Sequence, residues 1–201
     1  MVLAREPNGN PALVQLALAG LASDQARVRL GASKTLRLLS QEAPELVYPH
    51  FETFARMLAH PNSVLRWNAI LTLGNLAAVD QAGKLDGILD TYLSPIAGPH
   101  LIDAANTIHG AANIARAKPH LAKTIAEAIL QVSEATYATA ECRNVAIGHA
   151  IVALLGMSEQ ENVIEFVTGQ LRNPRPATRR KAEQFVRKFG SKLSAGVACL
   201  Y

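Results

Sequence analysis

"SVLRWNAILTLGNLAA", residues 63–78, and "LIDAANTIHGAANIAR", residues 101–116, align when one is shifted by 38 residues. Asn68 then falls on Asn106 and Asn75 on Asn113, while Ile70 falls on Ile108, Gly74 on Ala112 and Leu76 on Ile114. A repeat of about 33 to 47 residues is typical of helical solenoids, in which each unit buries its apolar surface against the next. This pair of segments therefore predicts the fold class of the whole chain.

The same pattern extends in both directions, through "ARVRLGASKTLRLLS" (26–40), "ECRNVAIGHAIVALL" (141–155) and "ATRRKAEQFVRKFG" (177–190). An apolar segment and a polar or proline-bearing turn precede each of these helices, and no segment alternates with a period of two. We therefore expect an all-α chain, a right-handed α-solenoid of about five antiparallel helical hairpins. The expected hairpins span residues 11–40, 44–79, 83–117, 120–156 and 159–189. Within them, the first helix of the second hairpin is expected over 44–59 and the second helix of the third hairpin over 100–117. They form a single domain over residues 1–190, followed by a C-terminal tail over 191–201. Asp24, Asn62 and Thr139 are the expected N-caps.

An arginine lies in the first turn of four of the second helices, at Arg29, Arg66, Arg143 and Arg179. The third repeat has Ala104 or Asp103 there instead. With the preceding turns rich in Asp, Asn and Pro, this pattern resembles the HEAT-repeat family and its armadillo-like relatives over about residues 11–190. The resemblance implies that the second helices line a concave groove and that the chain binds macromolecules. It predicts a non-enzymatic scaffold or adaptor that holds a protein or peptide in that groove.

A polar stripe interrupts the apolar helix around Trp67, which itself falls in the apolar arc and is expected to pack in the core. At 100° per residue, Asn68, Thr72 and Asn75 share an arc of about 60°. The stripe predicts one open edge, where side-chain amides can pair with an extended peptide backbone. The candidate groove residues are Asn68, Thr72, Asn75, Asn106, Asn113 and Asn144. In the fourth repeat an alignment on the arginine places Val145 and His149 there instead of Asn144 and Gly148. The alternative interpretation is that the amides cap neighbouring helices or face solvent.

Basic residues gather near the C-terminus. Residues 171–192 carry eight basic side chains and one acid, a charge of +7 in a chain of +4. This is typical of a solvated terminal repeat, or of a surface for nucleic acid or another polyanion, for which about five phosphate contacts would give a salt slope near −4.5. The candidate polyanion-binding residues are Arg172, Arg175, Arg179, Arg180, Lys181, Arg187 and Lys188. Among HEAT-like enzymes, the alkylpurine DNA glycosylases and the phycobilin lyases are the alternatives to a binding scaffold.

The sequence lacks the motifs of several functional classes. The two cysteines form no CxxC motif, and the six histidines form no HxxxH or HExxH, so we expect no metal, no cofactor, no catalytic residue and a reducing, cytoplasmic location. His109 and His149 lie on adjacent second helices and could approach each other. No apolar run is long enough to span a membrane. "ALVQLALAGLAS" (12–23) is expected to be a first helix and not a signal peptide. Its lack of a polar outer side predicts that either residues 1–10 fold over it or another chain covers it, and of these two we expect self-association through this helix.

Overall fold

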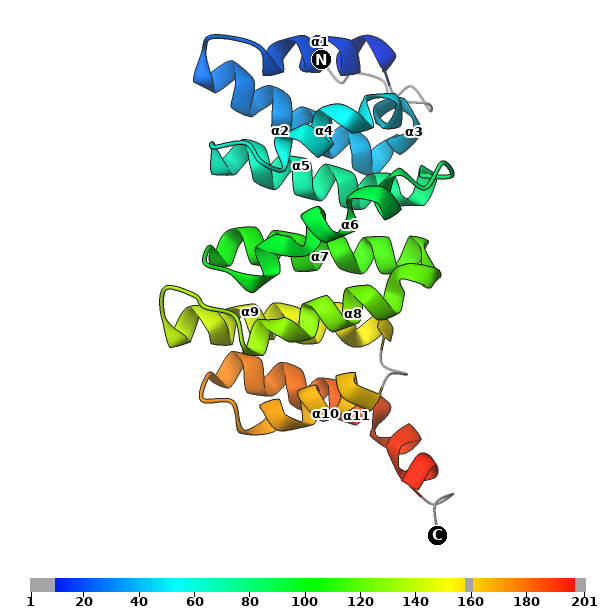
Figure 1. Ribbon diagram of the computed structural model, residues 1–201, viewed down its shortest axis with the longest axis vertical. Coiled ribbons are helices and arrows are strands. Elements are labelled where there is room, and N and C mark those ends of the chain that lie inside the picture. Colours follow the sequence, from blue (N-terminus) through cyan, green and yellow to red (C-terminus); the bar gives the residue numbers. More distant parts are fainter. Residues whose placement is uncertain (1–9, 158–160, 198–201) are drawn as a thin grey trace, which may run out of the picture. The chain divides into compact units, whose positions relative to one another are not determined.

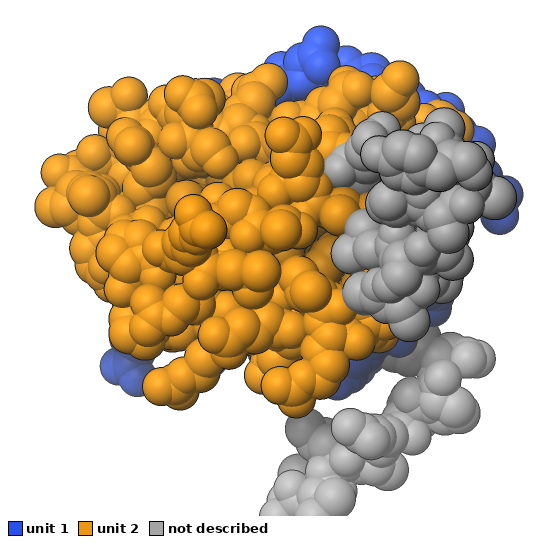
Figure 2. All heavy atoms as spheres, turned by 90° about the horizontal axis from the view of Figure 1, so that it is seen from below, with its two compact units in different colours: residues 1–92 blue, residues 93–201 orange. Residues whose placement is uncertain are grey.

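The computed structural model describes residues 10–157 and 161–197, with residue 161 and residues 190–197 described by their backbone alone. Throughout this part of the chain the regular structure is helical and no strand forms (Figure 1), which confirms the all-α class. The chain divides into two compact units, residues 1–92 (unit 1) and residues 93–201 (unit 2), coloured separately in Figure 2. Their continuity as one solenoid stays a prediction.

The helical segments of unit 1 are, in chain order, α1 (Pro11–Leu21), α2 (Ala26–Glu42), α3 (Pro44–Val47), η1 (Tyr48–His50), α4 (Phe51–Met57), α5 (Ser63–Leu76), η2 (Ala77–Val79) and α6 (Lys84–Leu93), whose last residue belongs to unit 2. α1 packs on α2, α2 on α5, and α4 on α5. Pro49 lies in η1, where the expected first helix over 44–59 is interrupted because proline has no N–H to donate.

The helical segments of unit 2 are η3 (Ser94–Ala97), α7 (Leu101–Ala117), η4 (Pro119–Leu121), α8 (Ala122–Leu130), η5 (Gln131–Ser133), α9 (Ala140–Ala153), η6 (Leu154–Met157), α10 (Glu161–Gly169), η7 (Gln170–Arg172) and α11 (Pro176–Val197). α7 packs on α9 and α9 on α11, while α8 contacts α10. The second helices of the hairpins therefore form one layer of this unit, and the first helices form the other.

Helix starts follow the expected capping chemistry at two of three positions. Asn62 accepts from the amides of Val64 and Leu65 at the start of α5, and Thr139 accepts from the amide of Cys142 at the start of α9. The prediction of Asp24 as an N-cap is wrong. α2 begins one residue later than that cap requires, with Gln25 in the N-cap position.

The four repeated arginines all reach back to a carbonyl oxygen of the preceding segment. Arg29 donates to Ser23 O at 2.6 Å, Arg66 to His60 O at 2.7 Å, and Arg179 to Asn173 O at 2.9 Å. Arg143 donates to Ala135 O at 3.1 Å. The same residue thus fastens each hairpin turn to its second helix by a charge-assisted hydrogen bond.

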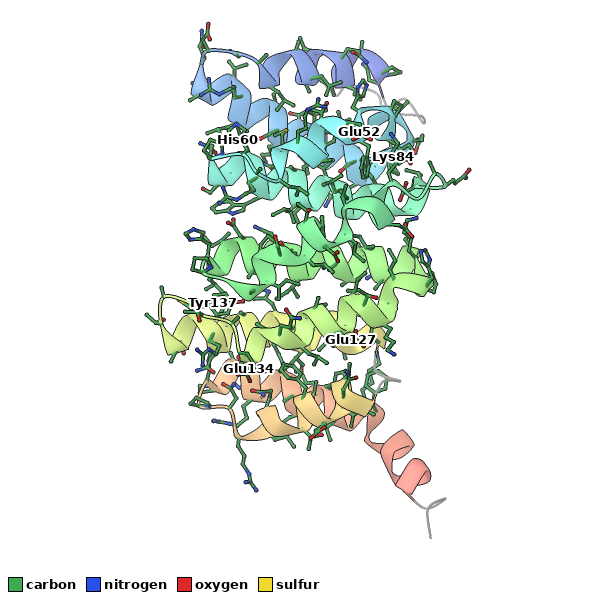
Figure 3. All side chains as sticks on the ribbon, viewed as in Figure 1. Glu52, His60, Lys84, Glu127, Glu134 and Tyr137 are labelled. Atoms are coloured by element: carbon green, nitrogen blue, oxygen red, sulfur yellow. The ribbon has the colours of Figure 1, made fainter. Side chains whose placement is uncertain are left out.

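In each unit, a buried tyrosine links two segments of the chain by a hydrogen bond from its hydroxyl group. The Tyr92 hydroxyl donates to Ile70 O at 3.0 Å in unit 1, and the Tyr137 hydroxyl donates to Ile96 O at 2.6 Å in unit 2. Burial raises the pKa of Tyr137 to about 12. On the surface of unit 1, Lys84 Nζ lies 3.2 Å from Glu52 Oε1; both side chains are labelled in Figure 3, as is Tyr137.

The C-terminal boundary differs from the expected one. α11 continues to Val197, so the expected tail over 191–201 begins inside a helix, and residues 198–201 lie outside the described residues. Among the described residues, no helix combines the length and the apolar character needed to cross a membrane.

Candidate functional site

A hollow of about 480 Å³ lies in unit 2 on the layer of second helices, lined by α7, α9, η6 and α11. Its volume falls within the range of about 300–1,000 Å³ found for small-ligand pockets. It is a candidate binding site because three packed helices, and not a loop, position its walls.

Each helix contributes one face to the hollow. His109, Asn113 and Arg116 on α7 stand four and three residues apart, so their side chains share a face. On α9, His149 and Val152 stand three residues apart, so their side chains also share a face. Val152 is 50 % exposed, so the hollow has an open apolar wall.

Lys181 is the contribution of α11, and its place is set by close packing on α9. Its Nζ donates to Gly148 O at 2.9 Å, and Thr178 Oγ1 donates to Asn144 O at 2.7 Å. A Cβ at Gly148 would lie 2.9 Å from Thr178 Oγ1 and 3.5 Å from Lys181 Nζ. Gly148 therefore allows the approach that places the ammonium group of Lys181 at the hollow.

The polar side chains of the lining are His109, Asn113, Arg116, His149 and Lys181, and among the described residues no carboxylate contributes to it. Arg116 Nη1 donates to Asn113 Oδ1 at a long 3.4 Å, so one lone pair of this amide oxygen is engaged and the NH₂ group remains a donor. The polar lining therefore offers hydrogen-bond donors to a ligand and carries positive charge.

The electrostatics of the hollow reflect this one-sided lining. Burial lowers the pKa of His149, and the charges of Lys181, His109 and Arg175 lower it further. Burial and the nearby Arg175 also lower the pKa of Lys181. Both groups thus hold a proton less readily than in water, because burial and nearby like charges disfavour the protonated form.

The asparagines of unit 1 are engaged with the neighbouring helix α2. Asn68 accepts from Arg37 Nε at 3.0 Å and donates to Ser33 Oγ at 3.0 Å and to Val64 O at 3.0 Å. Asn75 donates to Ser40 Oγ at 3.0 Å. The amide of Asn68 therefore links α5 to side chains of α2, a role that neither the open-edge interpretation nor its alternative includes.

Thr72 does not lie on the open edge that the helical wheel predicts. It is 0 % exposed, and its Oγ1 has no hydrogen-bond partner among the described residues. On the wheel Thr72 lies only about 20° from Leu65, which is buried, so the buried arc includes it. Trp67, expected in the core, is partly exposed.

The candidate asparagines of unit 2 have different surroundings. Asn113 lines the hollow. Asn144 Oδ1 accepts from Asn173 Nδ2 at 3.1 Å, so its amide supports the turn before α11. Asn106 is partly exposed on α7 and is not part of the lining.

The basic candidates divide into two groups. Arg175 Nε pairs with Glu141 at 2.8 Å, while Arg179 and Lys181 donate to carbonyl oxygens. The other four side chains are exposed, namely Arg172, Arg180, Arg187 and Lys188. Of the whole basic set, only Lys181 reaches the hollow.

Sequence reasoning missed Arg116 and Val152 as site residues. It considered His149 as one alternative for the polar stripe of the fourth repeat, and His109 only for its approach to His149. A signal for them existed, because 109, 113 and 116 share one face of a second helix. The two histidines do line the same hollow. Among the described residues, however, no three His, Cys, Asp or Glu side chains gather to hold a metal ion.

Comparison with known proteins gives a likeness of fold alone. No protein-family model matches the chain, and no curated protein matches it. A crystal structure titled as an engineered protein is similar, with a TM-score of 0.56 and 16 % sequence identity. The alignment covers 92 % of this chain and 86 % of that one.

Proposed function

We propose that the chain is a non-enzymatic binding module that holds an extended segment of a partner protein against the second helices of unit 2. The observation that carries this proposal is the hollow itself, with an open apolar wall at Val152 and a donor-rich polar lining without a carboxylate. Charge complementarity selects the occupant: a segment with an acidic side chain gains contacts that a neutral or basic one cannot make.

A selection from a library of random linear peptides, made on the immobilised full chain, tests this proposal. We expect enriched acidic sequences that bind Val152→Glu about tenfold more weakly than the unmodified protein. The matched control is Ile102→Glu on α7, because Ile102 is 53 % exposed and lies outside the lining. Selected peptides that bind the two variants equally would contradict the proposal, and so would selected sequences with no acidic residue.

We also infer that the helical pairs belong to a right-handed, HEAT-like solenoid. The support is the arginine contact that recurs at the turns of four hairpins, together with the stacking of α7, α9 and α11 in one layer. A crystal structure with the hairpins stacked in another order or with the opposite hand would contradict it.

A second candidate function is polyanion binding through the exposed basic residues of unit 2. The specific observation is that Arg172, Arg180, Arg187 and Lys188 are exposed. Four phosphate contacts would give a slope of log K against log salt of about −3.6. Filter binding of duplex DNA across a salt series measures this slope. A slope near zero would exclude polyanion binding through these four residues.

We do not propose the glycosylase or lyase alternatives for this hollow. The glycosylases that the sequence resembles need an aspartate and several aromatic side chains in the groove. The lining includes neither a carboxylate nor a Phe, Tyr or Trp side chain, and fold likeness alone supports no chemistry.

A further inference from the structure

We propose that the polar part of the hollow is a subsite for a phosphomonoester, such as a phosphorylated side chain of the bound segment. This inference rests on the proposed function, which it makes more specific. Three helices contribute to the subsite: His109, Asn113 and Arg116 from α7, His149 from α9, and Lys181 from α11.

The lining and a phosphomonoester are complementary in hydrogen bonding. Arg116 and Lys181 can only donate, and the NH₂ group of Asn113 also donates. Lys181 uses one of its three donors on Gly148 O, which leaves two for a ligand. At neutral pH the terminal oxygens of a phosphomonoester act mainly as acceptors, so they match these donors, and a neutral imidazole can present its N–H to them.

The charges of the lining and of a phosphomonoester are also complementary. A phosphomonoester carries about −1.5 to −2 at neutral pH, whereas a carboxylate carries a single negative charge. Arg116 and Lys181 supply two positive charges, and His149 supplies another when it takes up a proton. A dianion therefore neutralises the lining more completely than a carboxylate or a sulfate ester does.

Phosphate binding should also be coupled to proton uptake. The groups that face His149 are His109 from α7, Lys181 from α11, and Arg175 from the turn before α11; Arg175 is itself paired with Glu141 on α9. Burial lowers the pKa of His149 in the free protein, and this positive surrounding lowers it further. A bound phosphate raises that pKa, so binding takes up protons and tightens as the pH falls from 8 towards the second pKa of the phosphate, about 6.

The test is a chemical-shift titration of the ¹⁵N-labelled full chain with phenyl phosphate, with phenyl sulfate as the singly charged probe of similar size. We expect the largest shifts at the amides of residues 109–116, 148–152 and 181. We also expect phenyl phosphate to bind about tenfold more tightly than phenyl sulfate. Calorimetry in buffers of different ionisation enthalpy should show net proton uptake at pH 7.

Variants separate the subsite from general positive charge. Arg116→Gln and His149→Gln should weaken phenyl phosphate binding, the first by about tenfold, and His149→Gln should also reduce the proton uptake. Arg116→Lys should restore part of the affinity. Arg180→Gln is the matched control, because it removes a charge from α11 beside Lys181 but outside the lining, and it should change affinity less than about twofold.

Equal affinity for the two probes, or an equal loss in Arg116→Gln and Arg180→Gln, would overturn the inference. Failure of the inference and failure of the proposed function can be told apart. In one outcome, unphosphorylated peptides selected on the protein bind in a Val152-dependent way while phenyl phosphate does not bind. That result would support the peptide-binding function and contradict the phosphate subsite.

Discussion

Gly148 sets the distance between α9 and α11, and with it the position of Lys181. Two hydrogen bonds cross this contact, from Thr178 Oγ1 to Asn144 O and from Lys181 Nζ to Gly148 O. Because Thr178 is fully buried, it has no room to move away from an added methyl group. Because Gly148 has no side chain, α11 can pack closely on α9, and this packing places the ammonium group of Lys181 at the hollow.

We expect Gly148→Ala to destabilise the protein by about 1–3 kcal/mol, since its Cβ would lie too close to Thr178 Oγ1. Urea unfolding measures the change. Gly169→Ala in α10 is the control, because a Cβ there has nothing within 4 Å, and replacing glycine by alanine near a helix end should be neutral or stabilise by up to about 1 kcal/mol. Unchanged stability of Gly148→Ala would show that α11 lies farther from α9.

His149 should make the stability of the protein depend on pH. Its pKa is lowered in the folded protein from the ordinary value of 6.5. As the pH falls through 6.5, the unfolded chain therefore takes up the proton before the folded chain does, and stability decreases. We expect His149→Gln to lose less stability than the unmodified protein between pH 7.5 and pH 5.5, measured as the shift in urea midpoint. An equal loss in both proteins would contradict the lowered pKa.

At the scale of the element, the hairpin turn is fastened by one arginine in each of four repeats. Arg179 reaches Asn173 O, and Asn173 in turn accepts from the amide of Arg175 and donates to Asn144 and Gln170. The arginine thus acts on a turn that is already linked to the preceding second helix. Arg179 was predicted to bind polyanions because it is basic. Its observed contact with the turn shows a residue that stabilises the fold.

We expect Arg179→Met to destabilise the protein by about 1 kcal/mol, because a charge-assisted bond to a turn carbonyl is lost while the apolar stem remains. Arg180→Met removes the same charge from an exposed neighbour and should change stability by less than about 0.5 kcal/mol. Thermal unfolding of both variants makes the comparison. If the two melt at the same temperature, the arginine contact does not stabilise the turn.

The helices were predictable because their period and their turns are local properties of the sequence. The expected second helix over 100–117 corresponds to α7 at Leu101–Ala117, and Asn62 and Thr139 cap as expected. The site was less predictable. The wheel identified polar residues such as Asn68, but it could not show that Ser33 on another helix takes up that amide.

The candidate hollow depends on which helices pack together, and a helical wheel does not contain that information. Asn113 was placed in the peptide-binding set and Lys181 in the polyanion set, yet both line the same hollow. The contact of α9 with α11 joins these two sets, through the close approach of Thr178 and Lys181 to Gly148. Arg116 was missed because it belongs neither to the asparagine stripe nor to the basic stretch over residues 171–192.

At the scale of the whole molecule, the exposed apolar surface of unit 1 contrasts with the basic surface of unit 2. Leu16 on α1 is 71 % exposed and Leu13 is 38 % exposed. On α2, Val28 and Leu38 are also exposed. Four large apolar side chains exposed on two adjacent helices favour contact with another apolar surface over contact with water, and this supports the prediction that the chain self-associates through α1.

We expect the purified chain to form a dimer whose dissociation constant rises by about a hundredfold in Leu16→Gln, because a twofold-symmetric interface loses each leucine twice. Sedimentation equilibrium over a concentration series measures the constant. Ile102→Gln removes a comparably exposed side chain from unit 2 and should leave the dimer intact. A monomer at the highest concentration studied would exclude self-association, whereas an equal effect of both variants would move the interface away from α1. Leu16→Gln should leave phenyl phosphate binding unchanged, because Leu16 is not part of the lining of the hollow.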